Sequence, residues 1–219
     1  MILRTALLAV PLVVALVSPV SAQMVSKSRK PILIDDFESG TLAAWTVSSS
    51  GAGDWFVYSD GHTAPDPSRS DHDVPFNVPN PPQGKFAAVT DMNGPGTRIL
   101  SKDISLDGRY RLRLTVFYVN GGDAFVSGDT LASEGEANQQ FRIDLVDTSA
   151  PIDSLAAPAV LANVFHTSPG DPTSRQPTAV TFDLSRWAGR TIRLRLAAVG
   201  NRGPLRAGVD DIRLEPIAR

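Results

Sequence analysis

The 219-residue chain contains no cysteine. Disulfide bonds, thiolate zinc sites and thiol nucleophiles are therefore excluded. Small exported domains commonly use disulfides where the hydrophobic core is too small to hold the fold. This chain must instead draw its stability from a sizeable core or from a bound metal ion.

An excess of charge of one sign is also missing. Lys and Arg together number 21 and Asp and Glu 23, which leaves a formal net charge of −2. Nucleic-acid-binding proteins carry a basic stripe or patch, and the sequence shows none. Nucleic acid is therefore excluded as a partner, and the balance is too weak to predict any other charged partner.

A long hydrophobic run occurs in one place, at the N-terminus. Arg4 precedes an apolar run from Ala6 to Val17, and small residues follow up to Ala22. The run is shorter than the roughly 20 residues of a membrane-spanning helix. A signal peptide over residues 1–22, cleaved after Ala22, is therefore favoured over an uncleaved anchor. The mature protein is predicted to be secreted or periplasmic, without a membrane span, and to begin with a flexible lead-in over residues 23–31.

Helical periodicity is weak in the rest of the chain. Apolar and polar residues alternate through 109–118, 140–145 and 191–196, which predicts strands with one buried and one wet face. About ten strand candidates follow one another. The 17 Pro and 17 Gly residues fall mainly between them. The pattern predicts one all-β domain over residues 32–217, with little helix apart from the signal peptide.

Catalytic signatures are missing as well. The chain has no Gly-x-Ser-x-Gly nucleophile elbow and no phosphate-cradling glycine loop. Ser59, Asp60 and His62 stand close together, but a catalytic triad is assembled from separate elements of a fold. No pair of acids lies in a cleft motif of the glycosidase kind. We therefore expect the protein not to be an enzyme.

Two short motifs near opposite ends of the domain are the most informative. Residues 35–40 read Asp-Asp-Phe-Glu-Ser-Gly, and residues 207–214 read Ala-Gly-Val-Asp-Asp-Ile-Arg-Leu. Asp210 has the same period-2 parity as Ile212 and Leu214, so a strand would turn its carboxylate towards the apolar face. A carboxylate there is costly unless cations or hydrogen-bond donors meet it. We expect the first and last strands to lie side by side around a bound ion.

These motifs resemble those of galactose-binding-like jelly rolls, which include many secreted carbohydrate-binding modules and the MAM-type adhesion domains. The resemblance rests on Phe-Glu-x-Gly at 37–40 followed by Trp45, on Leu-Ser-x-Trp-Ala-Gly at 184–189, and on the closing motif. Residues 138–140 and 161–165 are similar to segments of uncharacterised bacterial secreted domains. The resemblance implies a two-sheet antiparallel jelly-roll sandwich of about ten strands.

The resemblance also implies a structural calcium ion. In the carbohydrate-binding relatives the Glu of the first motif and the first Asp of the closing pair hold this ion, and these correspond to Glu38 and Asp210. Asp36 and Asp211 add carboxylate oxygens, which calcium prefers as ligands. The predicted Ca²⁺ site therefore consists of Glu38, Asp210, Asp36 and Asp211. The alternative is that these acids cap turns or face water.

A second acidic group stands in a Pro-rich segment. Two histidines and three acids there have the chemistry of a transition-metal site. They lack any fixed metal-site spacing, so a solvated loop is the favoured interpretation. The residues are His62, Asp66, Asp71, His72 and Asp73.

Aromatic and basic side chains supply the remaining candidates. Trp55, Phe56 and Phe125 are candidate ligand-binding residues, because an exposed ring can stack on a sugar, although core packing is the alternative. Five arginines alternate with apolar residues and would pair across strands with Asp144 and Asp183, or else form a face for an anionic ligand. These are the arginines at 111, 113, 142, 193 and 195.

The function expected from the sequence is that of a secreted, noncatalytic binding module for a glycan or another cell-surface component, with a structural calcium. A structural or adhesion domain that binds a protein partner is the alternative, and a hydrolase acting on an extracellular polymer comes third. A large exposed apolar patch would favour the protein partner. A groove with exposed aromatic residues would favour sugar. Two long loops, 60–83 and 120–138, are functional or disordered.

Overall fold

The computed structural model describes residues 30–59, 78–91, 94–122 and 124–218. Within these ranges the chain forms eleven strands and one short 3-10 helix, η1 (Ser185–Trp187). The expectation of an all-β domain of about ten strands is confirmed. The strands are β1 (Ile32–Asp35), β2 (Thr46–Gly51), β3 (Asp54–Tyr58), β4 (Ala87–Asp91), β5 (Gly96–Ser105), β6 (Tyr110–Asn120), β7 (Gln139–Val146), β8 (Val160–His166), β9 (Ser174–Asp183), β10 (Thr191–Gly200) and β11 (Leu205–Pro216).

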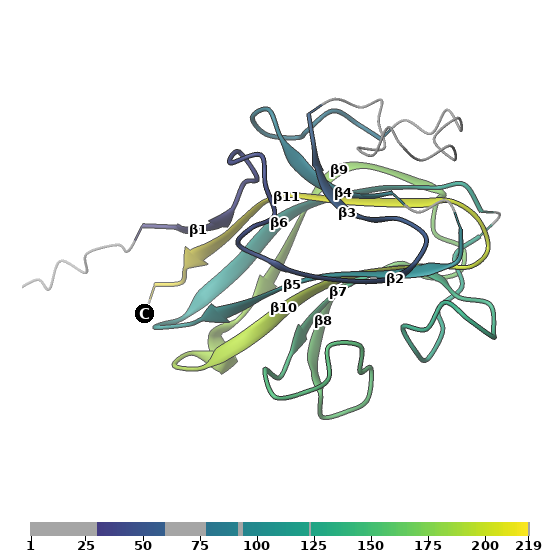
Figure 1. Ribbon diagram of the computed structural model, residues 1–219. Coiled ribbons are helices and arrows are strands. Elements are labelled where there is room, and N and C mark those ends of the chain that lie inside the picture. Colours follow the sequence, from purple (N-terminus) through teal and green to yellow (C-terminus); the bar gives the residue numbers. More distant parts are fainter. Residues whose placement is uncertain (1–29, 60–77, 92–93, 123, 219) are drawn as a thin grey trace, which may run out of the picture.

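The strands form two antiparallel sheets that pack face to face (Figure 1). The larger sheet has the order β3-β4-β11-β6-β9, and β1 pairs with β11 as its sixth strand. The smaller sheet has the order β2-β5-β10-β7-β8. The predicted two-sheet antiparallel sandwich is therefore confirmed.

The first and last strands are neighbours, as the two terminal motifs predicted. Ile32 of β1 lies opposite Leu214 of β11. Earlier along β11, the same edge pairs with β4, where Gly208 lies opposite Val89. On its other edge β11 pairs with β6 along most of its length. The last strand therefore joins three strands that lie far apart in the sequence.

The core lies between the sheets and is built by the alternation seen in the sequence. Leu112, Leu114 and Val116 of β6 face Leu194 and Leu196 of β10, and all five are fully buried. Two tryptophans close this layer: Trp45 is 8 % exposed and Trp187 is 3 % exposed. Removing apolar surface from water is the main favourable term in folding, so this core is the source of stability in a chain that has no disulfides.

The outer face of the smaller sheet is not wet along its whole length. Arg195 lies opposite Asp144 across β10 and β7, as expected, but both side chains are fully buried. Arg195 donates to the carbonyls of Ile152 and Ser154, each at 2.8 Å, and to Asp144 Oδ2 at 2.8 Å. The segment between β7 and β8 therefore covers this ion pair. The strand pattern predicted the pairing but could not show that a loop covers it.

Asp144 is held as a buried anion. Burial by itself raises the pKa of Asp144, but the hydrogen bonds and charges of Arg142 and Arg195 reverse this effect and lower the pKa below its usual value. Arg142 donates to both carboxylate oxygens, at 2.7 and 3.0 Å. Asn163 of β8 adds a third donor at 2.9 Å. The network ties β7, β8 and β10 together.

The second long loop, 120–138, packs against the sandwich in its described part. Leu131 is 3 % exposed and joins Ile99, Ala197 and Val199 in a cluster on the outer face of the smaller sheet. Thr97 donates a hydrogen bond to the carbonyl of Leu131 at 2.5 Å. This loop is therefore part of the folded body. Most of the first long loop lies outside the described residues.

The predicted signal peptide (residues 1–22) and most of the lead-in also lie outside the described residues. Within the ranges given above, no helix is long and apolar enough to span a membrane.

The buried pair and a matched exposed pair should respond differently to mutation. Asp144→Ala leaves the Arg195 guanidinium buried without its counter-ion, and we expect the free energy of unfolding to fall by about 3–5 kcal/mol. Asp103→Ala removes the pair that Arg193 makes on the solvent side of β5, where Asp103 is 45 % exposed. We expect this variant to lose at most about 1 kcal/mol. Urea unfolding of both variants tests the difference, and equal losses would contradict the burial of the Asp144 network.

Candidate functional site

The four acids of the predicted calcium site lie where β11 changes its neighbour. β4 pairs with β11 up to Val209, and β1 pairs with it from Ile212 onwards. Asp210 and Asp211 stand between these two pairings. The turn that carries Asp36 and Glu38 follows β1 directly. The two segments that the sequence analysis predicted to be neighbours are therefore neighbours in the structure.

Asp210 is fully buried, but it does not share a face with Ile212 and Leu214. The pairing of β11 with β6 shifts between Asp210 and Arg213, and Asp211 has a left-handed backbone with φ of 50°. Before this bulge Val209 lies in the core between the sheets, and after it Ile212 does. The bulge changes the parity of the strand, so Asp210 lies on the outer face of the larger sheet.

Each of the four acids already has a backbone N–H donor or an arginine side chain beside it. Asp210 accepts from the N–H groups of Gln83 and Asp211, at 2.9 and 2.7 Å, one at each oxygen. Glu38 Oε1 accepts from the N–H groups of Lys85 and Phe86, both at 2.8 Å.

The two remaining acids make local contacts. Asp36 Oδ1 accepts from the N–H of Glu38 at 3.2 Å. Asp211 Oδ2 pairs with the guanidinium of Arg213. In the described part of the chain, no group of three or more acidic or histidine side chains is arranged to hold a metal ion. A calcium shell needs six to eight oxygens, and here N–H groups approach the carboxylates instead. These N–H groups compete with a cation for the same carboxylate oxygens, and the calcium site stays a prediction.

The surroundings of Asp210 disfavour its charge. Burial raises the pKa of Asp210 to about 7; the N–H groups of Gln83 and Asp211 oppose the rise, and the charges of Asp211 and Glu38 add to it. Tyr58 lies nearby, donates to the carbonyl of Pro79 at 2.6 Å, and has its pKa raised by its own burial and then by Asp210. The site is thus a buried acid whose charge is disfavoured, next to the segment Gln83–Phe86, which we call the covering segment.

The predicted aromatic residues do not form a sugar-stacking platform. Trp55 is 3 % exposed and Phe125 is 1 % exposed, and both belong to the core between the sheets. Phe125 packs edge-on against Tyr118, with 5.1 Å between ring centroids. Phe56 is half-buried on the edge strand β3. Rings buried in this way have no free face for a ligand, so Trp55 and Phe125 are corrected to core residues.

The remaining sequence candidates divide between two places. The histidine and acid cluster at 62, 66 and 71–73 lies outside the described residues. On β6 and β9, Arg111 lies opposite Asp183, as expected. The pKa of Asp183 is lowered chiefly by hydrogen bonds from Ser185 and to a smaller extent by the charges of Arg109 and Arg111. The arginine rows are therefore largely explained by pairing.

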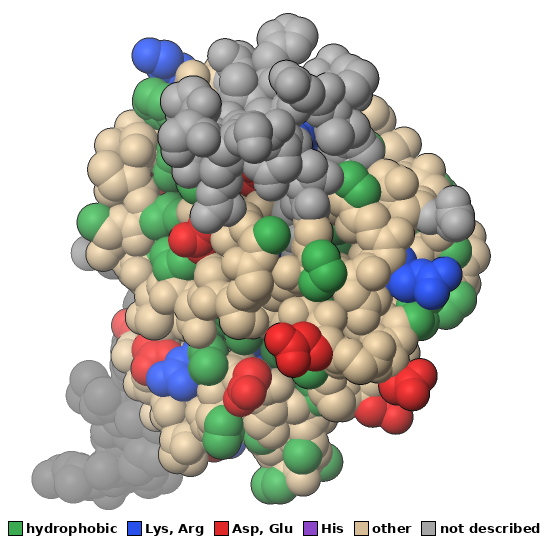
Figure 2. Space-filling model, turned by 45° about the vertical axis from the view of Figure 1, so that its right-hand side comes forward, with side chains coloured by type: hydrophobic (Ala, Val, Ile, Leu, Met, Phe, Trp, Pro, Cys, Tyr) green, Lys and Arg blue, Asp and Glu red, His purple; other side chains and the backbone are tan. Residues whose placement is uncertain are grey.

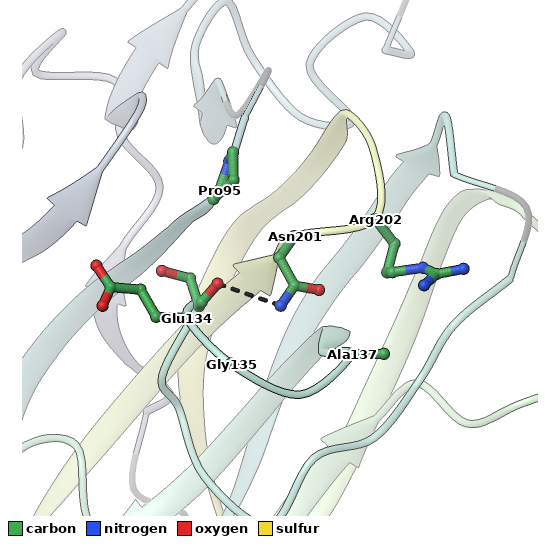
Figure 3. A pocket seen from close by; sticks show the side chains of 7 residues that line it. Pro95, Glu134, Gly135, Ala137, Asn201 and Arg202 are labelled. Atoms are coloured by element: carbon green, nitrogen blue, oxygen red, sulfur yellow. Dashed lines mark hydrogen bonds between the residues drawn. The ribbon is translucent and has the colours of Figure 1, made fainter.

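A pocket of about 420 Å³ lies at one end of the sandwich (Figure 3). Its walls come from three places: the residue before β5, the loop before β7, and the turn between β10 and β11. In Figure 3, Asn201 lies between Glu134 on one side and Arg202 on the other. The lining residues are Pro95, Ser133, Glu134, Gly135, Ala137, Asn201 and Arg202.

Asn201 fixes the shape of this pocket. Its side-chain amide donates to the carbonyls of Ser133 and Glu136, at 3.2 and 2.8 Å, and its Oδ1 accepts from the N–H of Asn138 at 2.9 Å. The N–H of Asn201 in turn donates to the carbonyl of Asn138 at 2.9 Å. One side chain therefore joins the loop before β7 to the turn before β11.

Two buried amides support the pocket from behind. Gln139 is fully buried; its Oε1 accepts from the N–H of Arg202 at 3.2 Å and its Nε2 donates to Asn120 at 2.8 Å. Asn138 donates to the carbonyls of Thr130 and Ala132, at 2.9 and 2.8 Å. Sequence reasoning did not find this pocket. The available signal was the run of amides at 138–140, because buried amides mark loops that must be held by side chains.

Comparisons with known proteins find similar folds. No family model matches the chain, and no curated protein matches it. TmCBM61 in complex with β-1,4-galactotriose is similar at a TM-score of 0.43 and 15 % identity, over 86 % of this chain and 100 % of that chain. The K1 cleaved adhesin domain of Lys-gingipain from Porphyromonas gingivalis W83 is similar at a TM-score of 0.49 and 10 % identity, over 87 % and 100 %.

A family 11 carbohydrate-binding module from Clostridium thermocellum, in complex with a β-1,3-1,4-mixed-linked tetrasaccharide, is similar at a TM-score of 0.41 and 9 % identity, over 86 % and 97 %. Carbohydrate-binding modules, which the sequence motifs resemble, are thus among the structures similar to this fold. At TM-scores below 0.5, such similarities assign neither a family nor a ligand to this chain.

The reassignment of the aromatic residues can be tested by truncation. Phe125→Ala removes a ring from the core, and we expect the free energy of unfolding to fall by about 3–5 kcal/mol. Phe56→Ala removes a half-buried ring from an edge strand and should cost less than half as much. Urea unfolding measures both values. A stable Phe125→Ala variant would show that this ring is not part of the core.

Proposed function

We propose that the protein is a noncatalytic glycan-binding module, and that its ligand occupies the pocket lined by residues 133–137 and 201–202. The observation that carries this proposal is the pocket itself: an open hollow with a mixed polar and apolar lining, whose walls are held by amide side chains. Its volume of about 420 Å³ lies within the range of small-molecule sites. Loops positioned by a rigid scaffold are common binding sites.

The chemistry of the lining suits a ligand with many hydroxyl groups. A sugar hydroxyl both donates and accepts hydrogen bonds. Glu134 offers carboxylate acceptors and Arg202 offers a fork of donors. Both side chains are exposed, and neither forms an ion pair with another described residue. Their polar groups are therefore available to a ligand.

Binding without catalysis is supported by the count of acids. Glycosidases use two carboxyl groups that flank the bond to be cleaved. Among the described residues that line the pocket, Glu134 is the single acid. The hydrolase alternative has no comparable support.

A glycan is also favoured over a protein partner. Three large hydrophobic side chains are exposed in the described part of the chain: Ile32, Leu33 and Val47. On the face drawn in Figure 2, the hydrophobic side chains of the described residues lie in small separate groups rather than in one large patch. Protein interfaces usually need a larger contiguous apolar area. The predicted signal peptide is consistent with a glycan outside the cell, and we propose that the mature protein is exported.

A glycan array with the mature protein tests the proposal. Arg202→Ala and Glu134→Ala each remove one polar wall of the pocket, and we expect each to weaken binding of the best array ligand by at least about tenfold. Both side chains are exposed, so thermal unfolding should remain as in the wild type. Isothermal titration measures the affinity.

Arg190→Ala is the matched control. Arg190 is also exposed and pairs with Asp147, but it precedes β10 and so lies at the end of that strand opposite Asn201. Binding should be unchanged in this variant. A broad array without any signal would refute the glycan proposal, as would binding that is unaffected by both pocket variants.

A further inference from the structure

The segment from Gln83 to Phe86 crosses a gap in the larger sheet. On one edge of β11, β4 ends its pairing at Val209 and β1 begins at Ile212. Two residues of β11 therefore have no strand partner on this edge. This covering segment runs past the gap immediately before β4 begins. Its position therefore affects how β4 pairs with β11.

Three N–H groups of this segment point to two carboxylates. The N–H of Gln83 donates to Asp210, and those of Lys85 and Phe86 donate to Glu38. The partners are 127, 47 and 48 residues apart in the sequence. These contacts therefore join the first turn of the domain, the segment before β4 and the last strand.

Gly84 makes this arrangement possible. Its φ of +64° lies in the left-handed region, and a Cβ at this position would overlap the carboxylate of Glu38. Consecutive N–H groups next to a left-handed residue form a concave anion-binding surface. Such a surface presents the positive ends of the peptide dipoles, which attract a carboxylate and repel a metal cation.

We infer that Glu38 and Asp210 form a metal-free clasp on residues 83–86: Glu38 binds the N–H groups of Lys85 and Phe86, and Asp210 binds that of Gln83 and so holds this segment on β11. The clasp holds the first turn of the domain and the last strand together, which is the role that the sequence analysis gave to calcium. Charge-assisted hydrogen bonds of this kind stabilise a carboxylate without a cation, and at Asp210 they oppose the rise in pKa that burial and the neighbouring charges cause. Stability of the domain is therefore independent of divalent cations.

The first measurement is thermal unfolding of the wild type with calcium and with a chelator, together with metal analysis of the purified protein. We expect the same Tm in both conditions and no stoichiometric metal. A Tm that falls on chelation, with calcium copurifying, would overturn the inference.

Isosteric variants test the clasp at about pH 8, above the pKa of Asp210. Glu38→Gln keeps the one oxygen that accepts both N–H groups, so its Tm should fall by about 2 °C or less. Asp210→Asn places an amide NH₂ against an N–H donor, because both oxygens of Asp210 are in use, and its Tm should fall by about 5 °C. Equal and chelator-dependent losses would instead indicate a shared ion.

Hydrogen exchange provides a readout at single positions. Glu38→Ala should accelerate exchange of the Lys85 and Phe86 amides by at least about tenfold, because they lose their acceptor. Asp36→Ala is the control: it removes an acid of the predicted calcium site whose hydrogen bond goes to the N–H of Glu38 and not to residues 83–86. Its amide exchange at 85 and 86 should match the wild type. Unchanged exchange in Glu38→Ala would refute the clasp.

Discussion

The last strand is the element on which the rest of the sandwich depends. β11 pairs with β6 on one edge and with β4 and then β1 on the other. Without it the larger sheet would separate into a hairpin of β3 and β4, a pair of β6 and β9, and an isolated first strand. Because these contacts join distant parts of the sequence, the larger sheet is completed only when the end of the chain has been added.

Much of this architecture could be predicted because strands obey a simple period. The alternation around Leu112, Leu114 and Leu194 gave the strands and their buried faces, and the terminal motifs gave the adjacency of β1 and β11. The same period failed at Asp210. A single extra residue at the Asp210–Asp211 bulge reverses the parity, and nothing in the local sequence marks it, since Asp211 is not a glycine. The strand that carries Asp210 was predicted correctly, but the face of the sheet on which Asp210 lies was not.

The site could be predicted less well than the fold, for a related reason. Exposure depends on what loops cover, and loops follow no period. Phe125 stands among glycine and aspartate residues in the sequence, yet it packs on Tyr118. Arg195 has the parity of a surface residue, yet the chain before β8 buries it. The pocket is formed by three loops that meet at one end of the sandwich, and no single motif contains its walls.

The position of the pocket relative to the chain ends has a mechanical consequence. The turn with Asn201 and Arg202 precedes the start of β11, whereas Ile32 meets Leu214 near the end of that strand (Figure 1). Strand residues advance by about 3.3 Å each, so a strand the length of β11 separates the pocket from both ends of the described domain by roughly 35 Å. A tether or a fused domain attached at either end would leave the pocket open and pointing away. A pulling force applied through both ends would load the pairing of β1 with β11 first and leave the end of the sandwich that carries the pocket unloaded.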